Sequence, residues 1–208
     1  MQMINSLMAW IQLDPVAIIK AGGYLGIAIV IFAESGILLG IFFPGDSLLF
    51  IAGLLSAGGF LSFGPLVLIV VVAAILGDSA GYWFGVKVGD ALFQRKDSRF
   101  FKQEYITRTQ KFFEAYGGRA IILARFVPIV RTIAPVLAGV GTMTYKKFIS
   151  YNIFGGLLWG AGMVSLGYFL GSIIPDCEKY VLLISLVIII LSFLPIFFNY
   201  IQTKRTII

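Results

Sequence analysis

The 208-residue sequence contains no histidine and a single cysteine, Cys177. The absence of histidine excludes a Ser-His-Asp triad and an H-E-x-x-H zinc site. One cysteine permits neither an internal disulfide nor a thiolate metal cage. We therefore expect no metal, no cofactor and no enzymatic activity.

Charged residues are scarce as well. They make up 12% of the chain, whereas 59% of it is hydrophobic and the mean hydropathy is +0.97. A soluble domain is about 25% charged, because those groups cover its surface in water. The composition predicts an all-α polytopic membrane protein and excludes a soluble enzyme. The positive flanks of membrane helices explain the net charge of +6 better than nucleic-acid binding does.

Long apolar runs predict the membrane spans. The spans cover approximately residues 17–33, 66–86, 148–170 and 181–201, and each is close to the roughly 20 helical residues that cross a hydrocarbon core. The first and last of them flank the rest as additional N-terminal and C-terminal spans. The polar segment 87–118 predicts a cytoplasmic loop.

Two further apolar stretches are interrupted. Residues 35–61 contain Pro44 and Gly45 near their middle, and residues 119–140 contain Pro128. Proline removes a backbone donor and glycine frees φ, so both break a helix. Broken backbone is tolerated at membrane depth only where protein or water surrounds it. We therefore expect two re-entrant hairpins, each made of two half-helices that enter and leave by the same side.

The basic residues favour this topology. With both termini and the 87–118 loop in the cytoplasm, 13 of the 16 Lys and Arg residues lie inside, Lys20 among them. Lys179 lies outside, and two arginines lie within the second hairpin. A second hairpin that crossed the membrane completely would move four more basic residues outside, against the preference for positive cytoplasmic flanks.

The two halves of the chain share a pattern. An Ala-Gly pair ending at Gly53 precedes Gly81 by 28 residues, and one ending at Gly139 precedes Gly167 by the same 28. Gly81 and Gly167 each begin a Gly-Tyr-aromatic-x-Gly sequence. In the topology above, one hairpin enters from each side. The sequence therefore predicts an inverted repeat of a hairpin and a transmembrane helix, as in many secondary transporters.

Five ionisable residues lie at predicted membrane depth, namely Glu34, Asp46, Asp78, Arg125 and Arg131. A charge at the bilayer centre costs about 2.5–3.5 kcal/mol on insertion scales, so such residues pair, face water or serve a function. A helix break between the two arginines allows them to converge on one site, where arginine binds phosphate bidentately. Buried carboxyl groups beside them are plausible proton carriers. The alternative for each residue is a structural ion pair, which applies most strongly to Asp78.

These residues resemble the signatures of the bacterial DedA family, which shares the VTT, or SNARE-associated, domain. Glu34 is followed twelve residues later by the aspartate of Phe-Pro-Gly-Asp46-Ser, and this spacing is similar to the first signature. Arg125-Phe-x-Pro-x-x-Arg131 is similar to the second. The resemblance covers roughly residues 25–171. Further matching residues are Gly77, Asp78, Tyr82, Gly85, Pro135, Ala138, Gly139, Asn152 and Trp159.

The resemblance implies a multi-pass protein of the bacterial inner membrane that moves lipids between leaflets. Bacterial members are linked to undecaprenyl-phosphate recycling and phospholipid movement, with dependence on proton or sodium gradients, and eukaryotic relatives behave as scramblases. The expected function is therefore flippase-like translocation of a lipid phosphate. The alternatives are a passive phospholipid scramblase, a proton or ion antiporter with indirect effects on lipids, and a structural assembly factor. The sequence does not decide whether the chain forms a homodimer.

The resemblance also implies roles for individual residues. Arg125 and Arg131 would bind the substrate, and Glu34 and Asp46 would couple transport to protons or sodium. Many family members have glutamate at the position of Asp46, whose shorter side chain changes its reach. Supporting residues would be Asp78, Pro44, Gly45 and Pro128.

Overall fold

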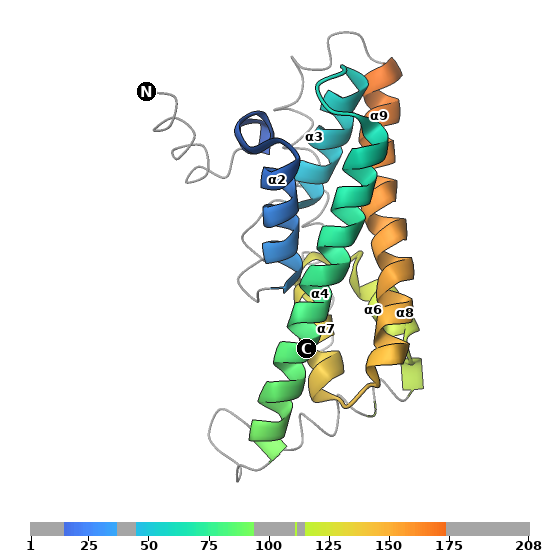
Figure 1. Ribbon diagram of the computed structural model, residues 1–208. Coiled ribbons are helices and arrows are strands. Elements are labelled where there is room, and N and C mark those ends of the chain that lie inside the picture. Colours follow the sequence, from blue (N-terminus) through green and yellow to red (C-terminus); the bar gives the residue numbers. More distant parts are fainter. Residues whose placement is uncertain (1–14, 37–44, 94–110, 112–114, 174–208) are drawn as a thin grey trace, which may run out of the picture.

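A computed structural model describes residues 15–36, 45–93, 111 and 115–173, which form helices and short turns with no strand in these ranges (Figure 1). The elements are α2 (Pro15–Gly36), α3 (Gly45–Ala57), α4 (Phe63–Phe93), α6 (Arg119–Ala124), α7 (Pro128–Val140), α8 (Tyr145–Gly156), the π-helix η2 (Leu157–Ala161) and α9 (Gly162–Ile173). The predicted span 181–201, Pro44, Cys177, Lys179 and most of the 87–118 loop lie outside the described residues.

Three described helical segments are long and apolar enough to cross a membrane, Pro15–Gly36, Phe63–Gly89 and Tyr145–Ile173. The third is continuous through α8, η2 and α9. Each contains one of the first three predicted spans, so the structure confirms an all-helical, multi-pass membrane protein.

The end of α4 differs from the prediction. The helix continues to Phe93, so residues 87–93 are helical, although their polarity predicted the start of a loop. A helix satisfies its own backbone hydrogen bonds and does not have to end where the apolar run ends. Lys87 is exposed on this extension.

Helix α2, which contains the first predicted span, runs in the same direction as α4. Near the start of both helices, the Ser62 backbone N–H donates a hydrogen bond to the Tyr24 hydroxyl over 2.7 Å. At the end of α2, Gly36 packs against the backbone of Gly77, halfway along α4. The polypeptide therefore goes from one end of the molecule to its middle in α2, and α3 then returns to the same end (Figure 1).

A kink shortens the straight part of α2. Gly23 has φ 53° and ψ −140°, so the straight part of the helix after it has only 13 residues. That part is about 20 Å long, whereas a hydrocarbon core is about 30 Å thick. Lys20 precedes the kink in α2, and Lys87 lies in the last turns of α4.

Two helix pairs, α3 with α9 and α4 with α7, pack backbone against backbone. A methyl group added to Gly53 of α3 would overlap the Val164 carbonyl of α9, and one added to Gly167 of α9 would overlap the Phe50 carbonyl of α3. Such contacts between small residues are typical of membrane helices. The glycines at the α4–α7 crossing that make equivalent contacts are Gly85 and Gly139.

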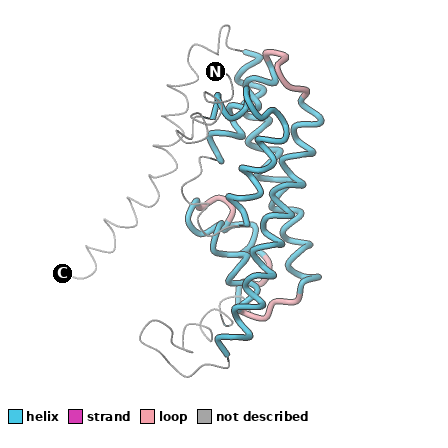
Figure 2. The backbone as a smooth tube through the Cα atoms, turned by 60° about the vertical axis from the view of Figure 1, so that its left-hand side comes forward, coloured by secondary structure: helices cyan, strands magenta, loops and turns pink. Residues whose placement is uncertain are grey.

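The α3–α4 and α7–α8 connections lie at opposite ends of the bundle (Figure 2). Aliphatic side chains of α2, α3, α4 and α9 form the core toward the first end. A smaller cluster around Tyr82 and Phe148 forms the core toward the second end, where the Tyr82 hydroxyl donates to the Met143 carbonyl. On α4, Asp78 lies between these two cores. The charged residues are therefore enclosed by apolar packing on both sides.

Candidate functional site

The predicted break in the second interrupted stretch is present. Helix α6 ends at Ala124 and α7 begins at Pro128, with Val127 in an extended conformation between them (φ −117°, ψ 109°). Proline disfavours a helical conformation in the residue before it and is well tolerated in the first turn of a helix. The break separates Arg125 from Arg131, which lies in the first turns of α7.

Arg131 binds both carboxylates that the sequence singled out. Its Nη1 donates to Asp46 Oδ1 over 2.6 Å, and its Nη2 donates to Glu34 Oε1. The group is largely enclosed: the exposed fractions of the side chains are 2% for Glu34, 11% for Arg131 and 20% for Asp46. Three helices, α2, α3 and α7, thus meet at one ionic contact.

Gly45 provides the space for Glu34. It is the first residue of α3, and its Cα faces the Glu34 carboxylate so closely that a methyl group there would overlap it. Glu34 Oε2 is buried beside this backbone and has no well-aligned hydrogen bond within the described residues. Glycine at position 45 therefore permits the close approach of backbone to carboxylate.

Arg125 does not join this group and binds a different carboxylate. It donates to Asp78 of α4 and to the Asn152 side-chain carbonyl of α8, and both ion-pair side chains are 5% exposed. The Asn152 amide is oriented by a hydrogen bond from Nδ2 to the Ile75 carbonyl, 3.1 Å long. The two arginines therefore do not share one set of partners, and Asp78 forms the ion pair that the sequence alternative suggested.

Two glycines of α8 make room for Arg125. Its Cδ and Nε lie against Gly155, and its guanidinium lies near Gly156. Larger side chains at these positions would meet the arginine. The sequence alone assigns these glycines no role, because a Gly-Gly pair in an apolar helix is also expected from close helix packing.

Trp159 links the two ionic groups. Its Nε1 donates to Asp46 Oδ1 over 2.9 Å, and its ring centroid lies 5.0 Å from Arg131 Cζ and 6.0 Å from Arg125 Cζ. Both arginines are within cation–π range. The residue lies in the π-helix η2, a feature that often occurs at functional sites. The sequence singles out Trp159 only through its resemblance to the family pattern. No local pattern predicts the π-helix.

The charges of the two groups do not balance. Three carboxylates face two guanidinium groups, which leaves one net negative charge when all five are ionised. Burial makes an uncompensated charge costly. The excess lies on the Glu34–Asp46–Arg131 group, because Arg125 and Asp78 neutralise each other. This group is therefore the place where a proton or another cation would restore neutrality.

Residues 43–169 match the family model of the VTT domain. An uncharacterized membrane protein of Mycobacterium tuberculosis is 47% identical over 191 residues, which cover 88% of this chain and 83% of that protein. Protein DedA of Escherichia coli is 41% identical over 184 residues, covering 88% and 84%. Inner membrane protein YqjA of the same species is 33% identical over 157 residues, covering 76% and 71%. No solved structure matches.

Proposed function

This chain belongs to the DedA family of VTT-domain membrane proteins, and from that premise we propose that it moves a lipid phosphate between the leaflets of a bacterial inner membrane. The substrate class includes undecaprenyl phosphate and phospholipids. The observation that supports the proposal best is the contact of Arg131 with Glu34 and Asp46. Arg131 is a largely enclosed side chain suited to bind anions, and carboxylates occupy its donors.

The proposed mechanism is competition for Arg131. A phosphate headgroup matches the donor fork of a guanidinium, as a carboxylate does. Glu34 and Asp46 occupy these donors in the structure. A headgroup reaches Arg131 only when at least one carboxylate leaves, and protonation of Glu34 removes the charge that holds it there. Headgroup binding and proton uptake are then linked, and release of the lipid reverses both.

Arg125 has a different part in this mechanism from the one first expected. Its ion pair with Asp78 is neutral and enclosed, and Asn152 completes it. The residue holds the break between α6 and α7 against α4 and α8, and so fixes the start of α7 from which Arg131 extends. We retain Arg131 as the principal headgroup ligand and treat Arg125 as a positioning residue.

The proposed path of the lipid depends on two facing re-entrant hairpins. Helices α2 and α3 would form the first and α6 and α7 the second, one entering from each side of the membrane. The directions of these helices and the glycine crossings at Gly53 and Gly139 support an inverted repeat. Exposed Lys87, Arg119, Lys146 and Lys147 lie at the end where the second hairpin begins, which favours that end as cytoplasmic.

The proposal is tested with the full chain reconstituted in vesicles. Leaflet transfer of a fluorescent short-chain polyprenyl phosphate and of a phospholipid is followed with and without an imposed pH gradient, and separately with a sodium gradient. Gradient-dependent transfer of the lipid phosphate supports the proposal. Transfer of both lipids at rates independent of either gradient would indicate a passive scramblase, and transfer of neither would refute lipid translocation.

A further inference from the structure

A groove of about 620 Å³ lies between α6 and α7 and continues onto the residues just before α6. It is separate from the ionic groups described above, since none of their five charged residues lines it. Most of its lining is apolar, and the residues that matter here are Ala120, Leu123, Val127, Val130, Ala134 and Leu137.

The groove results from the spacing of apolar residues on α7. Val130, Ala134 and Leu137 are three and four residues apart, so they lie on one face of the helix. Arg131 emerges from a different face, toward α2 and α3. Val130 is 45% exposed, and Leu123, on the opposite wall, is 67% exposed. In the part of the chain that the structure describes, no helix covers this apolar face.

One end of the groove is basic. Arg119 lines it together with Tyr116, is exposed, and makes no ion pair within residues 115–173 or the other described ranges. Lys147 is also exposed, and its ammonium lies close to Gly117, beside Tyr116. Along its length the groove therefore changes from cationic at the end of the molecule to apolar toward the middle.

We propose that this groove binds one hydrocarbon chain of an anionic phospholipid, with the headgroup at Arg119 and Lys147. A phospholipid matches this change from charged to apolar along the groove, because its anionic phosphate lies at the membrane surface and its hydrocarbon chains extend toward the bilayer centre. Basic side chains near a membrane surface attract such headgroups. The site binds lipid at equilibrium, so it does not depend on the proposed transport activity.

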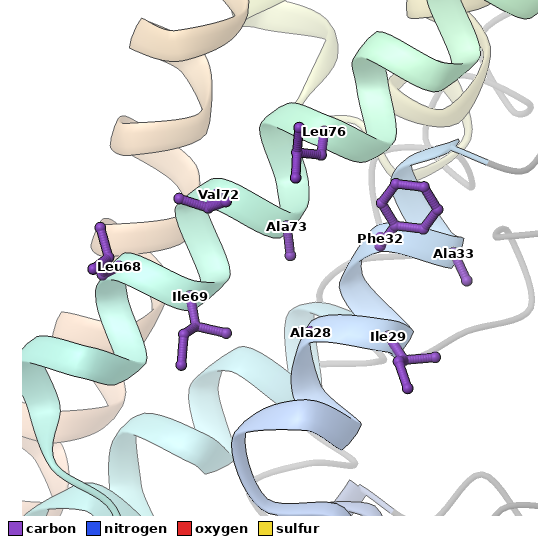
Figure 3. Close-up of a pocket in the computed structure, with 9 residues that line it drawn as sticks. All are labelled: Ala28, Ile29, Phe32, Ala33, Leu68, Ile69, Val72, Ala73 and Leu76. Atoms are coloured by element: carbon purple, nitrogen blue, oxygen red, sulfur yellow. The ribbon is translucent and has the colours of Figure 1, made fainter.

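A second groove, which lacks a basic end, shows why the basic residues of the α6–α7 groove would select an anionic phospholipid. It lies between α2 and α4, has a volume of about 680 Å³, and is lined only by apolar residues, including Phe32, Leu68 and Leu76 (Figure 3). That groove is as large and as apolar as the α6–α7 groove, but it has no charged residue in its lining. It selects no headgroup and provides a matched control.

The experiment measures lipid binding to the purified full chain in detergent by native mass spectrometry. The probes are phosphatidylglycerol and phosphatidylcholine with identical acyl chains. The wild-type protein should prefer phosphatidylglycerol. Arg119→Gln should reduce that preference about fivefold, the effect of one basic residue near an anionic surface, and Lys147→Gln should act in the same direction. Lys87→Gln, which removes an exposed basic residue outside the groove lining, should leave the preference unchanged.

A bulky side chain placed in the groove tests binding of the hydrocarbon chain independently of headgroup charge. Leu123→Trp should reduce binding of both lipids severalfold, whereas Leu68→Trp, at a residue 66% exposed in the control groove, should not. Both leucines are largely exposed, so the variants should fold, and thermal stability verifies this. Val130→Trp is a second filling variant, used if Leu123→Trp does not fold. An unchanged headgroup preference in Arg119→Gln, or equal losses in the two tryptophan variants, would overturn the proposal.

Discussion

The carboxylate of Glu34 occupies the space that a side chain at Gly45 would need. This relationship joins the end of α2 to the beginning of α3 across a stretch of chain that contains the first predicted helix break. It also makes the position of one carboxylate depend on a glycine that has no charge. A methyl group at Gly45 can therefore be used to disturb the Glu34–Arg131 contact without altering either charged residue.

Gly45→Ala should weaken the Glu34–Arg131 contact, because the new methyl group displaces the carboxylate. We expect a loss of about 1.5–3 kcal/mol of stability, the range for hydrogen bonds to charged groups, together with reduced transport. Thermal unfolding in detergent measures the first and vesicle assays the second. The matched control is Gly162→Ala, where an added methyl group meets nothing within 4 Å and should stabilise the helix by up to about 1 kcal/mol. Equal behaviour of the two variants would contradict the proposed clash.

Arg131→Lys keeps the charge but loses the two-donor fork that matches a phosphate. The variant should fold, yet bind a short-chain polyprenyl phosphate about 1–3 kcal/mol more weakly. Arg131→Ala should lose more binding and also stability, since Glu34 and Asp46 would be left without a counter-charge. Equilibrium binding and unfolding of both variants in detergent are the measurements. Binding by Arg131→Lys that equals wild type would exclude the bidentate role.

Asp78→Asn should destabilise the protein by about 3–5 kcal/mol, because it leaves Arg125 buried without an opposite charge. Replacing both partners, Asp78→Asn with Arg125→Gln, removes the unpaired charge and should recover much of the loss. The comparison uses unfolding of the single and double variants in one detergent. If the double variant is as unstable as the single one, Arg125 does not act through its pairing with Asp78.

Lipid-phosphate binding should be accompanied by proton uptake, since protonation of Glu34 releases Arg131 for the headgroup. Calorimetric titrations in two buffers of different ionisation enthalpy give the number of protons taken up at constant pH. Glu34→Gln should bring that number close to zero, because the amide cannot accept the proton. Asp46→Asn is the comparison variant, and it should retain part of the uptake. A wild-type proton count in Glu34→Gln would assign the proton to another group.

Trp159→Phe removes the hydrogen bond to Asp46 but keeps an aromatic ring beside Arg131. The expected loss of stability is about 1.5–3 kcal/mol, the range for a hydrogen bond to a charged group. Trp159→Leu also removes the cation–π contacts and should lose more. Unfolding in detergent compares the stability of the wild type with that of the two variants. A phenylalanine variant with wild-type stability would mean that the Asp46 contact contributes nothing to stability.

The helix break before α7 and the charged residues at membrane depth could be predicted from sequence because each has a local cause. Pro128 disfavours a helical conformation at Val127, and a buried charge requires a partner whatever the fold. Which carboxylate pairs with which arginine could not be predicted, since it depends on how four separate helices cross. Sequence proximity gave no reason to place Asp78 rather than Glu34 beside Arg125.

The direction of α2 relative to α4 could not be predicted for a related reason. Its apolar run has the length of a complete span, and hydropathy contains no information on direction. The left-handed conformation of Gly23 shortens the straight part of the helix, and glycine in an apolar run is common enough to give no warning. The π-helix at Trp159 is not predicted either, because no local sequence pattern distinguishes it from an α-helix.

The two glycine crossings bring α3 into close backbone contact with α9, and α4 into close backbone contact with α7. The Trp159–Asp46 hydrogen bond connects α3 to the π-helix η2, whereas the Arg131–Asp46 ion pair connects α3 to α7. Arg131 thus connects the two helix pairs. A headgroup that takes the place of Asp46 on Arg131 would break this ion pair. Binding would then itself remove a contact that holds the two helix pairs together.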